Sequence, residues 1–327
     1  MKIVITDHRF PQVDHERRAV EEARWNLVVG QAGSEDQLIE LCRDADGVLA
    51  GRALITERVL AAMKSCRIIV RYGIGVETID IPAATNHGIM VANVPDYCID
   101  EVSDHALTLL LMLSRQIVPA MALAAVEPWS IAKMPALHRL RGQVCGLFGF
   151  GRIGSLLASK IFQLGMYVVV YDPYLTESRA QELKIEPVSF ESLLRRSDFI
   201  SIHAPLNDET HQVFGEAAFQ KMKDTVFIIN AARGGLINEA ALLAALNTGK
   251  IAGAALDVLD SETPTPAQAF LRNHPKVILT PHSAWLSQEA RSNMQASAIA
   301  QVIACLKGET PYGLINRTVQ PRGLRAC

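Results

Sequence analysis

A glycine-rich segment limits the possible fold of this chain more than any other feature of its sequence. The segment reads Gly149-Phe150-Gly151-Arg152-Ile153-Gly154, follows an apolar run at 144–148 and precedes a helical pattern at 155–164. In such a turn the first glycine permits the tight bend, the second lets a pyrophosphate approach the backbone, and the third allows close packing of helix on strand. Free N–H groups at the helix N-terminus would bind the phosphates. The segment therefore predicts a dinucleotide-binding strand, loop and helix.

An acidic residue lies where such a domain needs one. The next apolar run, 167–171, is followed directly by Asp172, about twenty residues after the glycines. Its carboxylate would accept hydrogen bonds from the adenosine ribose hydroxyls and would repel a 2′-phosphate, which predicts NAD or NADH rather than NADP. The alternative is a glycine turn beside an unrelated surface aspartate.

Apolar β-rich runs alternate with helical patterns along the chain, and this alternation predicts an α/β fold with parallel sheets. We expect a first set of strands at 3–5, 27–29, 47–50, 68–70 and 89–92, and a second at 144–148, 167–171, 199–202, 226–229, 252–256 and 277–279. The second set suits the sheet of a doubly wound, Rossmann-like domain. A length of 327 residues also suggests about two domains.

The connections between the two sets of strands predict a discontinuous first domain. A long apolar helix at 101–114 leads out of the first set, and residues 118–140, which include three prolines, are expected to be irregular. A final helix at 288–307 follows the last strand, and its return to the N-terminal domain would give two crossings between domains. We therefore predict a first domain at 1–100 and 286–327 with a second domain, 101–285, inserted into it.

Composition excludes several classes of partner. The 32 basic residues nearly balance the 34 acidic ones, and the net charge of -2 gives no field that would favour nucleic acid or an anionic membrane. No uninterrupted apolar stretch is long enough to span a bilayer, and the N-terminal segment has the pattern of a strand rather than a signal sequence. The six cysteines are scattered without metal-type spacing, which suits reduced thiols. We expect a cytoplasmic protein with a small-molecule partner and no metal.

Three residues that can carry acid–base chemistry follow strands of the second set, at the sheet edge where ligands of open α/β sheets bind. They are Arg233, Glu262 and His282. Arginine offers a planar fork of donors for a carboxylate or a carbonyl group. Histidine has an unperturbed pKa that suits a proton donor to a developing alkoxide, and a carboxylate beside it would stabilise the imidazolium. Together they predict reduction of a ketone, whereas Arg233 alone also fits a surface role. We expect His105 and His211 to be structural, and His203 to be structural or close to the cofactor.

These residues, in this order, resemble the D-isomer-specific 2-hydroxyacid dehydrogenases over nearly the whole chain. The likeness rests on GFGRIG, Ala231 to Gly235, Asp257 to Glu262 and Thr280-Pro281-His282. It implies two Rossmann-like domains, with an NAD domain inserted into a discontinuous substrate-binding domain, and a homodimer. It also implies that Arg233, Glu262 and His282 are catalytic and that Asp257 contacts the nicotinamide carboxamide.

The resemblance extends to the substrate site. Val70-Arg71-Tyr72-Gly73-Ile74-Gly75 resembles the family's substrate-carboxylate loop, in which backbone N–H groups receive the anion. The stretches IVRYGIG, NVPDYCIDEVSDHAL and TPHSAW are most similar to the C-terminal-binding proteins, in which a tryptophan after the catalytic histidine lines the substrate pocket. Trp285 would then favour a 2-oxo acid with an apolar side chain. The alternative is that Trp285 is a core aromatic.

The sequence therefore predicts a cytoplasmic NAD-dependent D-2-hydroxyacid dehydrogenase that acts as a 2-oxoacid reductase. Two alternatives stay open: an NAD(H)-sensing protein-binding module like the C-terminal-binding proteins, and a hydroxypyruvate or glyoxylate reductase or phosphoglycerate dehydrogenase of the same fold. Glu262 argues against formate, because formate dehydrogenases of this superfamily carry an amide there. The chain stops soon after the final predicted helix, so we expect no regulatory extension like that of the long phosphoglycerate dehydrogenases.

Overall fold

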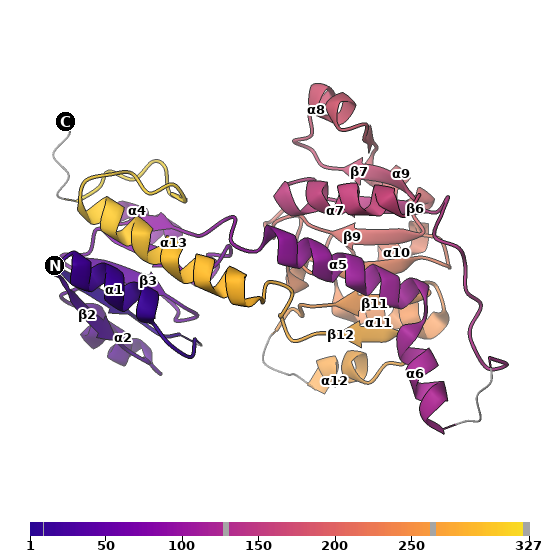
Figure 1. Ribbon diagram of the computed structural model, residues 1–327, viewed down its shortest axis with the longest axis horizontal. Coiled ribbons are helices and arrows are strands. Elements are labelled where there is room, and N and C mark those ends of the chain that lie inside the picture. Colours follow the sequence, from indigo (N-terminus) through magenta and orange to yellow (C-terminus); the bar gives the residue numbers. More distant parts are fainter. Residues whose placement is uncertain (9, 127–130, 262–265, 323–327) are drawn as a thin grey trace. The chain divides into compact units, whose positions relative to one another are not determined.

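The computed structural model describes residues 1–8, 10–126, 131–261 and 266–322 (Figure 1). The chain forms two compact units. The terminal unit comprises Met1–Tyr97 and Ser287–Cys327, and the central unit comprises Cys98–Leu286. The predicted limits of a substrate-binding domain and an NAD domain, at 1–100 with 286–327 and at 101–285, stay a prediction about function.

The terminal unit contains a five-stranded sheet in which every neighbouring pair is parallel. Its order, β2-β1-β3-β4-β5, places later strands on both sides of β1, as in doubly wound folds. The strands are β1 (Lys2–Ile5), β2 (Asn26–Val29), β3 (Gly47–Ala50), β4 (Ile68–Arg71) and β5 (Met90–Ala92). All five predicted strands are confirmed.

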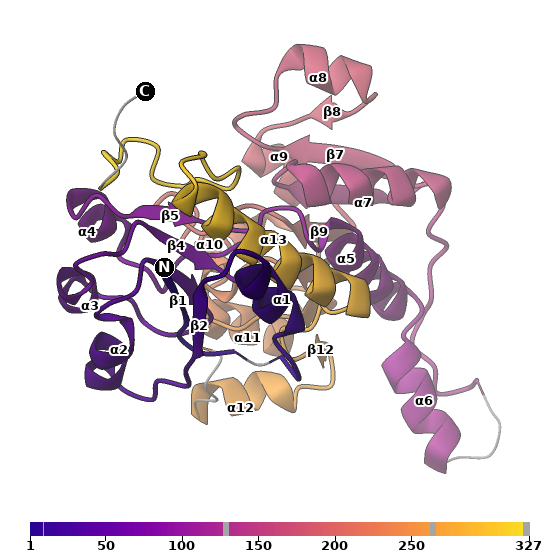
Figure 2. The same cartoon turned by 60° about the vertical axis from the view of Figure 1, so that its left-hand side comes forward.

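Helices cover both faces of this sheet. Figure 2 shows α2 (Glu35–Cys42), α3 (Glu57–Ala62) and α4 (Ile81–Asn86) along one face, and α1 (Asp14–Glu22) with α13 (Gln288–Leu306) along the other. The first three helices share a buried apolar cluster with the strands. Helix α13 contacts β3, β4 and α1. The predicted return of the last helix to the N-terminal part of the chain is therefore confirmed.

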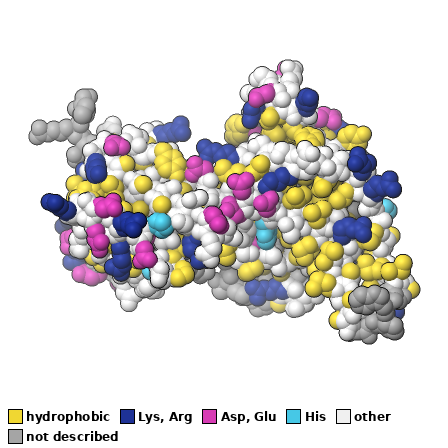
Figure 3. All heavy atoms as spheres, viewed as in Figure 1, with side chains coloured by type: hydrophobic (Ala, Val, Ile, Leu, Met, Phe, Trp, Pro, Cys, Tyr) yellow, Lys and Arg dark blue, Asp and Glu magenta, His cyan; other side chains and the backbone are white. Residues whose placement is uncertain are grey.

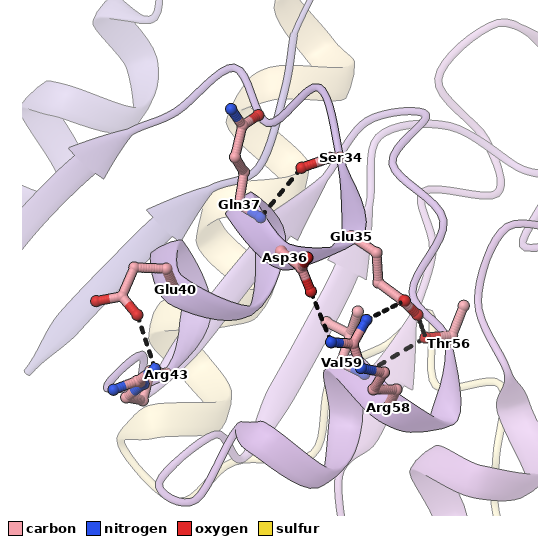
Figure 4. Close-up of polar contacts among 9 residues, drawn as sticks. All are labelled: Ser34, Glu35, Asp36, Gln37, Glu40, Arg43, Thr56, Arg58 and Val59. Atoms are coloured by element: carbon pink, nitrogen blue, oxygen red, sulfur yellow. Dashed lines mark hydrogen bonds and ion pairs between the residues drawn. The ribbon is translucent and has the colours of Figure 1, made fainter.

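Side-chain hydrogen bonds join α2 to α3 (Figure 4). Ser34 Oγ caps the N-terminus of α2 by accepting a backbone N–H bond, as serine commonly does. Thr56 Oγ1 donates to Glu35 Oε1 at 2.5 Å, and Arg58 binds Glu35 at 2.7 Å and Asp36 at 2.6 Å. These bonds from Thr56 and Arg58 lower the pKa of Glu35. The pairs are largely exposed, so they fix helix spacing and add little to stability.

The central unit contains a seven-stranded parallel sheet with the order β12-β11-β10-β9-β6-β7-β8. The strands are β6 (Val144–Phe148), β7 (Tyr167–Tyr171), β8 (Glu186–Pro187), β9 (Phe199–Ile202), β10 (Phe227–Asn230), β11 (Gly253–Leu256) and β12 (Val277–Leu279). The Rossmann-like, doubly wound arrangement and all six predicted strands are confirmed. The sequence pattern did not predict the two-residue edge strand β8.

Both faces of the central sheet are covered as well. Helices α5 (Ile99–Ser114) and α7 (Arg152–Gln163) pack on each other and on one face, and α9 (Phe190–Arg196), α10 (Glu216–Lys221) and α11 (Glu239–Thr248) cover the other. Figure 1 shows α5 and α7 in front of the strands. The remaining short elements are α8 (Glu177–Glu182), η1 (Gly234–Leu236) and α12 (Pro266–Arg272). With the faces covered, the loops at the carboxyl ends of the strands remain for a site.

The segment 118–140 is not irregular throughout, because Ile117–Val126 forms helix α6. Pro119 lies in its first turn, where a missing N–H breaks no helical bond, and the alanines that follow favour a helix. Exposed apolar residues include Ile117, Val118 and Met121, and Figure 3 shows apolar side chains gathered where α6 lies. No single described helix is long and apolar enough to cross a membrane, although α5 and Ile117–Ala125 together meet that test as a pair bent by 57°.

Candidate active site

The glycine segment has the geometry of a pyrophosphate-binding loop. Gly149 has φ +94°, and a Cβ there would lie 2.6 Å from Ala204 N. A Cβ on Gly154 would lie 2.6 Å from Gly149 O, whereas one on Gly151 would meet no protein atom within 4 Å. The first and third glycines are thus required by packing, and the second leaves the backbone open to a ligand. Arg152 and Ile153 begin α7, whose first N–H groups have no helical acceptor, so these residues fit a dinucleotide.

Asp172 is tied to this loop directly. Its Oδ2 accepts the N–H of Phe150 at 2.7 Å, and its Oδ1 accepts the N–H of Tyr174 at 2.8 Å. Each carboxylate oxygen has a second lone pair, which can accept a ribose hydroxyl. The end of β7 and the phosphate loop are therefore held together by the residue that was predicted to select NAD.

His203 lies under the phosphate loop. It follows β9, is packed beside Gly149 and Gly154, and its Nε2 lies 2.8 Å from Ser201 Oγ. Burial lowers the pKa of His203 to about 4, so the ring is neutral at physiological pH. A neutral ring of this kind supports the loop rather than exchanging protons, which agrees with the structural alternative considered for His203.

The segment that carries Arg233 is fixed by the end of β10. The buried Asn230 side chain accepts the N–H of Ala232 at 3.0 Å and donates to Arg233 O at 2.9 Å. Arg233 is half-buried, and one guanidinium N–H donates to Ala232 O at 2.7 Å. A Cβ on Gly234 would lie 2.0 Å from the carbonyl carbon of Leu259. Only glycine therefore lets the chain after β11 pack directly against the arginine segment.

Asp257 follows β11 and organises the segment after β12. Its backbone N–H donates to Asn230 O at 2.8 Å. Its buried carboxylate accepts the hydroxyl of Thr280 at 2.5 Å and the N–H groups of Ser283 and Ala284, both at 2.9 Å. Three of its four lone-pair positions are therefore used by the turn around residue 282. This role in holding the turn was not predicted from the sequence, and the predicted contact with nicotinamide stays a prediction.

His282 has an unusual backbone conformation for a residue other than glycine. Its φ is +52°, a left-handed conformation that costs about 1–2 kcal/mol for an L-residue with a Cβ. The His282 N–H donates to Asp257 O at 2.8 Å and to Thr280 O at 3.0 Å, and these bonds hold the conformation. Strain of this kind is found at functional sites, where the surrounding structure imposes it.

One contact at this edge of the sheet was not predicted from the sequence. His105, in the second turn of α5, has its Nε2 3.0 Å from Thr280 Oγ1 and 3.6 Å from Asp257 Oδ1. It was expected to be structural. The contact joins positions 175 apart in the chain, and no motif or spacing in the sequence relates them.

Glu262 lies outside the described residues, so its predicted contact with His282 stays a prediction. The chain on either side is well fixed. Glu239 Oε1 accepts the N–H of Asp260 at 2.7 Å, and Gln268 Nε2 donates to Ser261 O at 3.0 Å. In the described ranges, no group of three or more His, Cys, Asp or Glu side chains could hold a metal ion.

The loop after β4 in the terminal unit has the features of an anion-binding turn. Gly73 has φ +118°, its carbonyl accepts the N–H of Val94 at 3.0 Å, and Asn93 donates to Ile74 O at 2.7 Å. Within the described part of the chain, no acceptor engages the N–H groups of Gly73, Ile74 and Gly75. The carbonyls are thus fixed while successive N–H groups remain for a ligand.

The two large side chains of this loop are held within the terminal unit. Arg71 donates to Tyr72 O. The Tyr72 ring is 4% exposed, and its hydroxyl donates to Oε1 of the buried Glu16 at 2.7 Å. Burial raises the pKa of Tyr72 most, and the charge of the nearby Glu16 raises it further. Tyr72 therefore contributes to the predicted site by shaping the loop.

Within the central unit, hydrogen bonds connect three of the predicted site segments in series. Asn230 links the Arg233 segment to Asp257, and Asp257 links to His282. Trp285, three residues after His282, is half-buried, and the choice between a substrate-pocket role and a core role for it stays open. The segments that carry Arg233, Asp257 and His282 are thus joined at the carboxyl ends of β10, β11 and β12, along the same sheet edge as the phosphate loop after β6.

This arrangement is that of a dinucleotide-dependent dehydrogenase, and comparison with known proteins places the chain more closely. Residues 107–284 match the family model for the D-isomer specific 2-hydroxyacid dehydrogenase, NAD binding domain. The chain belongs to the D-isomer-specific 2-hydroxyacid dehydrogenase family. The predicted family and the predicted cofactor, NAD, are confirmed by this match. The likeness to the C-terminal-binding-protein subgroup stays a prediction.

Individual relatives agree with this assignment. D-3-phosphoglycerate dehydrogenase from Archaeoglobus fulgidus is 38% identical over 82% of this chain and 51% of its own length. Glyoxylate reductase from Korarchaeum cryptofilum is 35% identical over 88% of this chain and 87% of its own. The structure of D-lactate dehydrogenase from Aquifex aeolicus matches with a TM-score of 0.89 and 25% identity, over 96% and 99% of the two chains. The chain spans only about half the length of the phosphoglycerate dehydrogenases that it matches.

Proposed function

We propose that this protein is an NAD-dependent D-2-hydroxyacid dehydrogenase that reduces a small 2-oxo acid to the D-2-hydroxy acid. The observation that carries the proposal is the series Arg233, Asp257 and His282, linked by hydrogen bonds at adjacent strand ends. It lies in the unit that contains the phosphate loop, at the sheet edge where open α/β folds bind their ligands. The named relatives, a glyoxylate reductase and a D-lactate dehydrogenase, support the substrate class.

When bound, NADH supplies the hydride that reduces the carbonyl carbon. Gly149, Gly151 and Gly154 with the first N–H groups of α7 would hold its pyrophosphate, and Asp172 would hold the adenosine ribose. The Asp257 carboxylate has one lone-pair position left by its bonds to the 280–284 turn. The predicted contact with the nicotinamide carboxamide would use this position, which is buried in this structure.

The chain's own residues would complete the reaction around the carbonyl group. The Arg233 guanidinium would bind the substrate's carboxylate or carbonyl oxygen, since its fork of donors matches two oxygens. His282 in its imidazolium form would donate one proton to that oxygen as the hydride reaches carbon, so that one 2-oxo acid, one NADH and one proton give one 2-hydroxy acid and one NAD. Glu262 would stabilise the imidazolium. The N–H groups of Gly73 to Gly75 would bind the substrate carboxylate.

An NADH-oxidation screen over 2-oxo acids tests this proposal. We expect turnover on at least one small 2-oxo acid, and a loss of about 10²–10⁴-fold in kcat for His282→Ala, because that variant lacks the proton donor. NADH binding by the variant, followed by fluorescence, should be unchanged. Tight NADH binding with no turnover on any 2-oxo acid would instead favour the NAD(H)-sensing module. Trp285→Ala, measured on apolar and small substrates side by side, tests its predicted place in the pocket.

We propose that the protein is a homodimer with α6 in the interface. Ile117, Val118 and Met121 are exposed on this helix, Met121 at 67%. A cavity of about 440 Å³ beside it is lined mostly by apolar residues, which include Pro135 and Val277. Exposed apolar patches of this kind mark interaction surfaces. Met121→Asp should sediment as a monomer, while Tyr174→Asp, which changes another exposed apolar residue, should remain dimeric. A dimeric Met121→Asp protein would contradict this assignment.

We further propose a cytoplasmic location. Cys42, Cys66 and Cys145 are buried and form no disulfide, and burial raises the pKa of Cys42 and of Cys145 to about 12. Protonated, buried thiols are typical of proteins from reducing compartments. Cell fractionation with an antibody to the protein tests this location, and recovery from an oxidising compartment would contradict it.

A further inference from the structure

His105 is a polar residue that neither the phosphate loop nor the predicted acid–base set accounts for. It lies on α5, whose neighbouring residues Val102, Ala106 and Leu109 are buried apolar side chains. Its side chain is 22% exposed and reaches the carboxyl ends of β11 and β12, where it meets Thr280 and Asp257. Through His105, α5 therefore contacts the segment that carries His282.

The direction of each hydrogen bond in this group can be assigned. The Thr280 hydroxyl has one hydrogen, and the 2.5 Å contact with the Asp257 carboxylate requires that hydrogen, because an ionised carboxylate only accepts. Thr280 Oγ1 must then accept from His105, 3.0 Å away. The Nε2 of His105 therefore carries a proton, whether the ring is neutral or charged. The series runs from His105 to Thr280 to Asp257, with every donor pointing toward the carboxylate.

The same carboxylate holds the turn around His282. Asp257 accepts the N–H groups of Ser283 and Ala284 through its side chain, and that of His282 through its carbonyl. Because His282 is held at φ +52°, its ring position depends on these bonds. A shift of about 1 Å in a reacting group can cost about 10²-fold in rate.

We propose that His105 is a positioning residue, which acts through Thr280 and Asp257 to hold His282 where it can donate its proton. The inference rests on the proposed function, in which His282 is the proton donor. His105 itself would touch neither substrate nor cofactor. Its removal should lower kcat with little change in NADH binding, because the phosphate loop and Asp172, which would hold the pyrophosphate and the ribose, follow β6 and β7, whereas Asp257 and Thr280 follow β11 and β12.

Four variants test this role. His105→Leu removes the donor, His105→Gln retains an N–H donor at a similar reach, and Thr280→Val removes the intermediate hydroxyl. Ser103→Ala is the matched control, because Ser103 is a buried residue of the same helix that binds Lys160 and Asp100 instead. For each we would measure kcat and KM with a 2-oxo acid, the Kd for NADH and the urea unfolding midpoint.

We expect His105→Leu and Thr280→Val each to lower kcat about 10- to 100-fold, with the Kd for NADH and the unfolding midpoint close to those of Ser103→Ala. His105→Gln should recover most of the lost kcat. Because His105 and Thr280 act in one series, the double variant His105→Leu with Thr280→Val should have a kcat no lower than that of the slower single variant. This pattern would not arise if His105 only stabilised the fold.

Several results would overturn the inference. They are a His105→Leu kcat equal to that of Ser103→Ala, failure of His105→Gln to recover activity in a folded protein, or fully additive losses in the double variant. His282→Ala, assayed alongside, separates this inference from the proposed function. If His282→Ala turns over normally, the proposed proton donor is wrong; if it is inactive while His105→Leu is fully active, only the positioning role fails.

Discussion

Asp257→Asn should destabilise the central unit, because an amide cannot replace this carboxylate in either orientation. Oδ1 accepts the Ser283 N–H and the Thr280 hydroxyl, and Oδ2 accepts the Ala284 N–H. With the NH₂ group at either position, a backbone N–H faces another donor. Asp257 and Ala284 are buried and Ser283 is half-buried, so water replaces the lost acceptor poorly. An unsatisfied buried donor costs about 1–3 kcal/mol.

This cost converts into a measurable change in thermal stability. For a unit of this size, Tm falls by about 2–4 °C per kcal/mol, so circular dichroism should show a loss of about 5 °C in the central unit's transition. Asp224→Asn is the control, because Asp224 is a largely exposed partner of Lys250 and surface substitutions have small effects. If Asp257→Asn were as stable as Asp224→Asn, the assigned hydrogen bonds around the 280–284 turn would be wrong.

Two further predictions concern the phosphate loop. Gly151→Ala should leave the urea midpoint unchanged, because its Cβ meets no protein atom within 4 Å. The same variant should raise the Kd for NADH at least about tenfold, because the added methyl group blocks the pyrophosphate. Gly154→Ala should lose stability as well, because its Cβ would lie 2.6 Å from Gly149 O. Equal NADH affinity for Gly151→Ala and wild type would refute the first part. Burial lowers the pKa of His203 to about 4. As pH falls below 6.5, the unfolded chain therefore binds a proton at His203 while the folded chain does not. The folded state loses stability between pH 6.5 and 4 for this reason. From pH 7 to 5 this residue alone should cost about 2 kcal/mol, and urea titrations should find a smaller loss for His203→Gln than for wild type.

Local patterns in the sequence were sufficient for much of the fold. Apolar runs bounded by polar residues predicted the strands of both sheets, because parallel strands buried on both faces need such runs. The spacing of Gly149, Gly151 and Gly154 with Asp172 predicted the cofactor, since strand, turn and helix are contiguous in the chain. The expectation of irregular structure was wrong for 118–126, because Pro119 falls in the first turn of a helix, where proline is tolerated.

Contacts between distant segments could not be predicted in the same way. The Asp257 carboxylate binds the turn 26 and 27 residues later, and His105 reaches Thr280 across 175 positions. Such contacts depend on which strands become neighbours and on the register between them. From the sequence, Asp257 was therefore predicted only to contact the nicotinamide. Its hydrogen bonds to the turn around His282 are visible only in the structure.

Deuterium labelling tests most directly whether NADH hydride passes to a 2-oxo acid to give a D-2-hydroxy acid. The protein would be incubated with NADH labelled with deuterium at C4 of the nicotinamide and with the best 2-oxo acid from the screen. We predict a product with deuterium at C2 and the D configuration, by mass spectrometry and chiral chromatography. A product without deuterium at C2, or with the L configuration, would contradict the account.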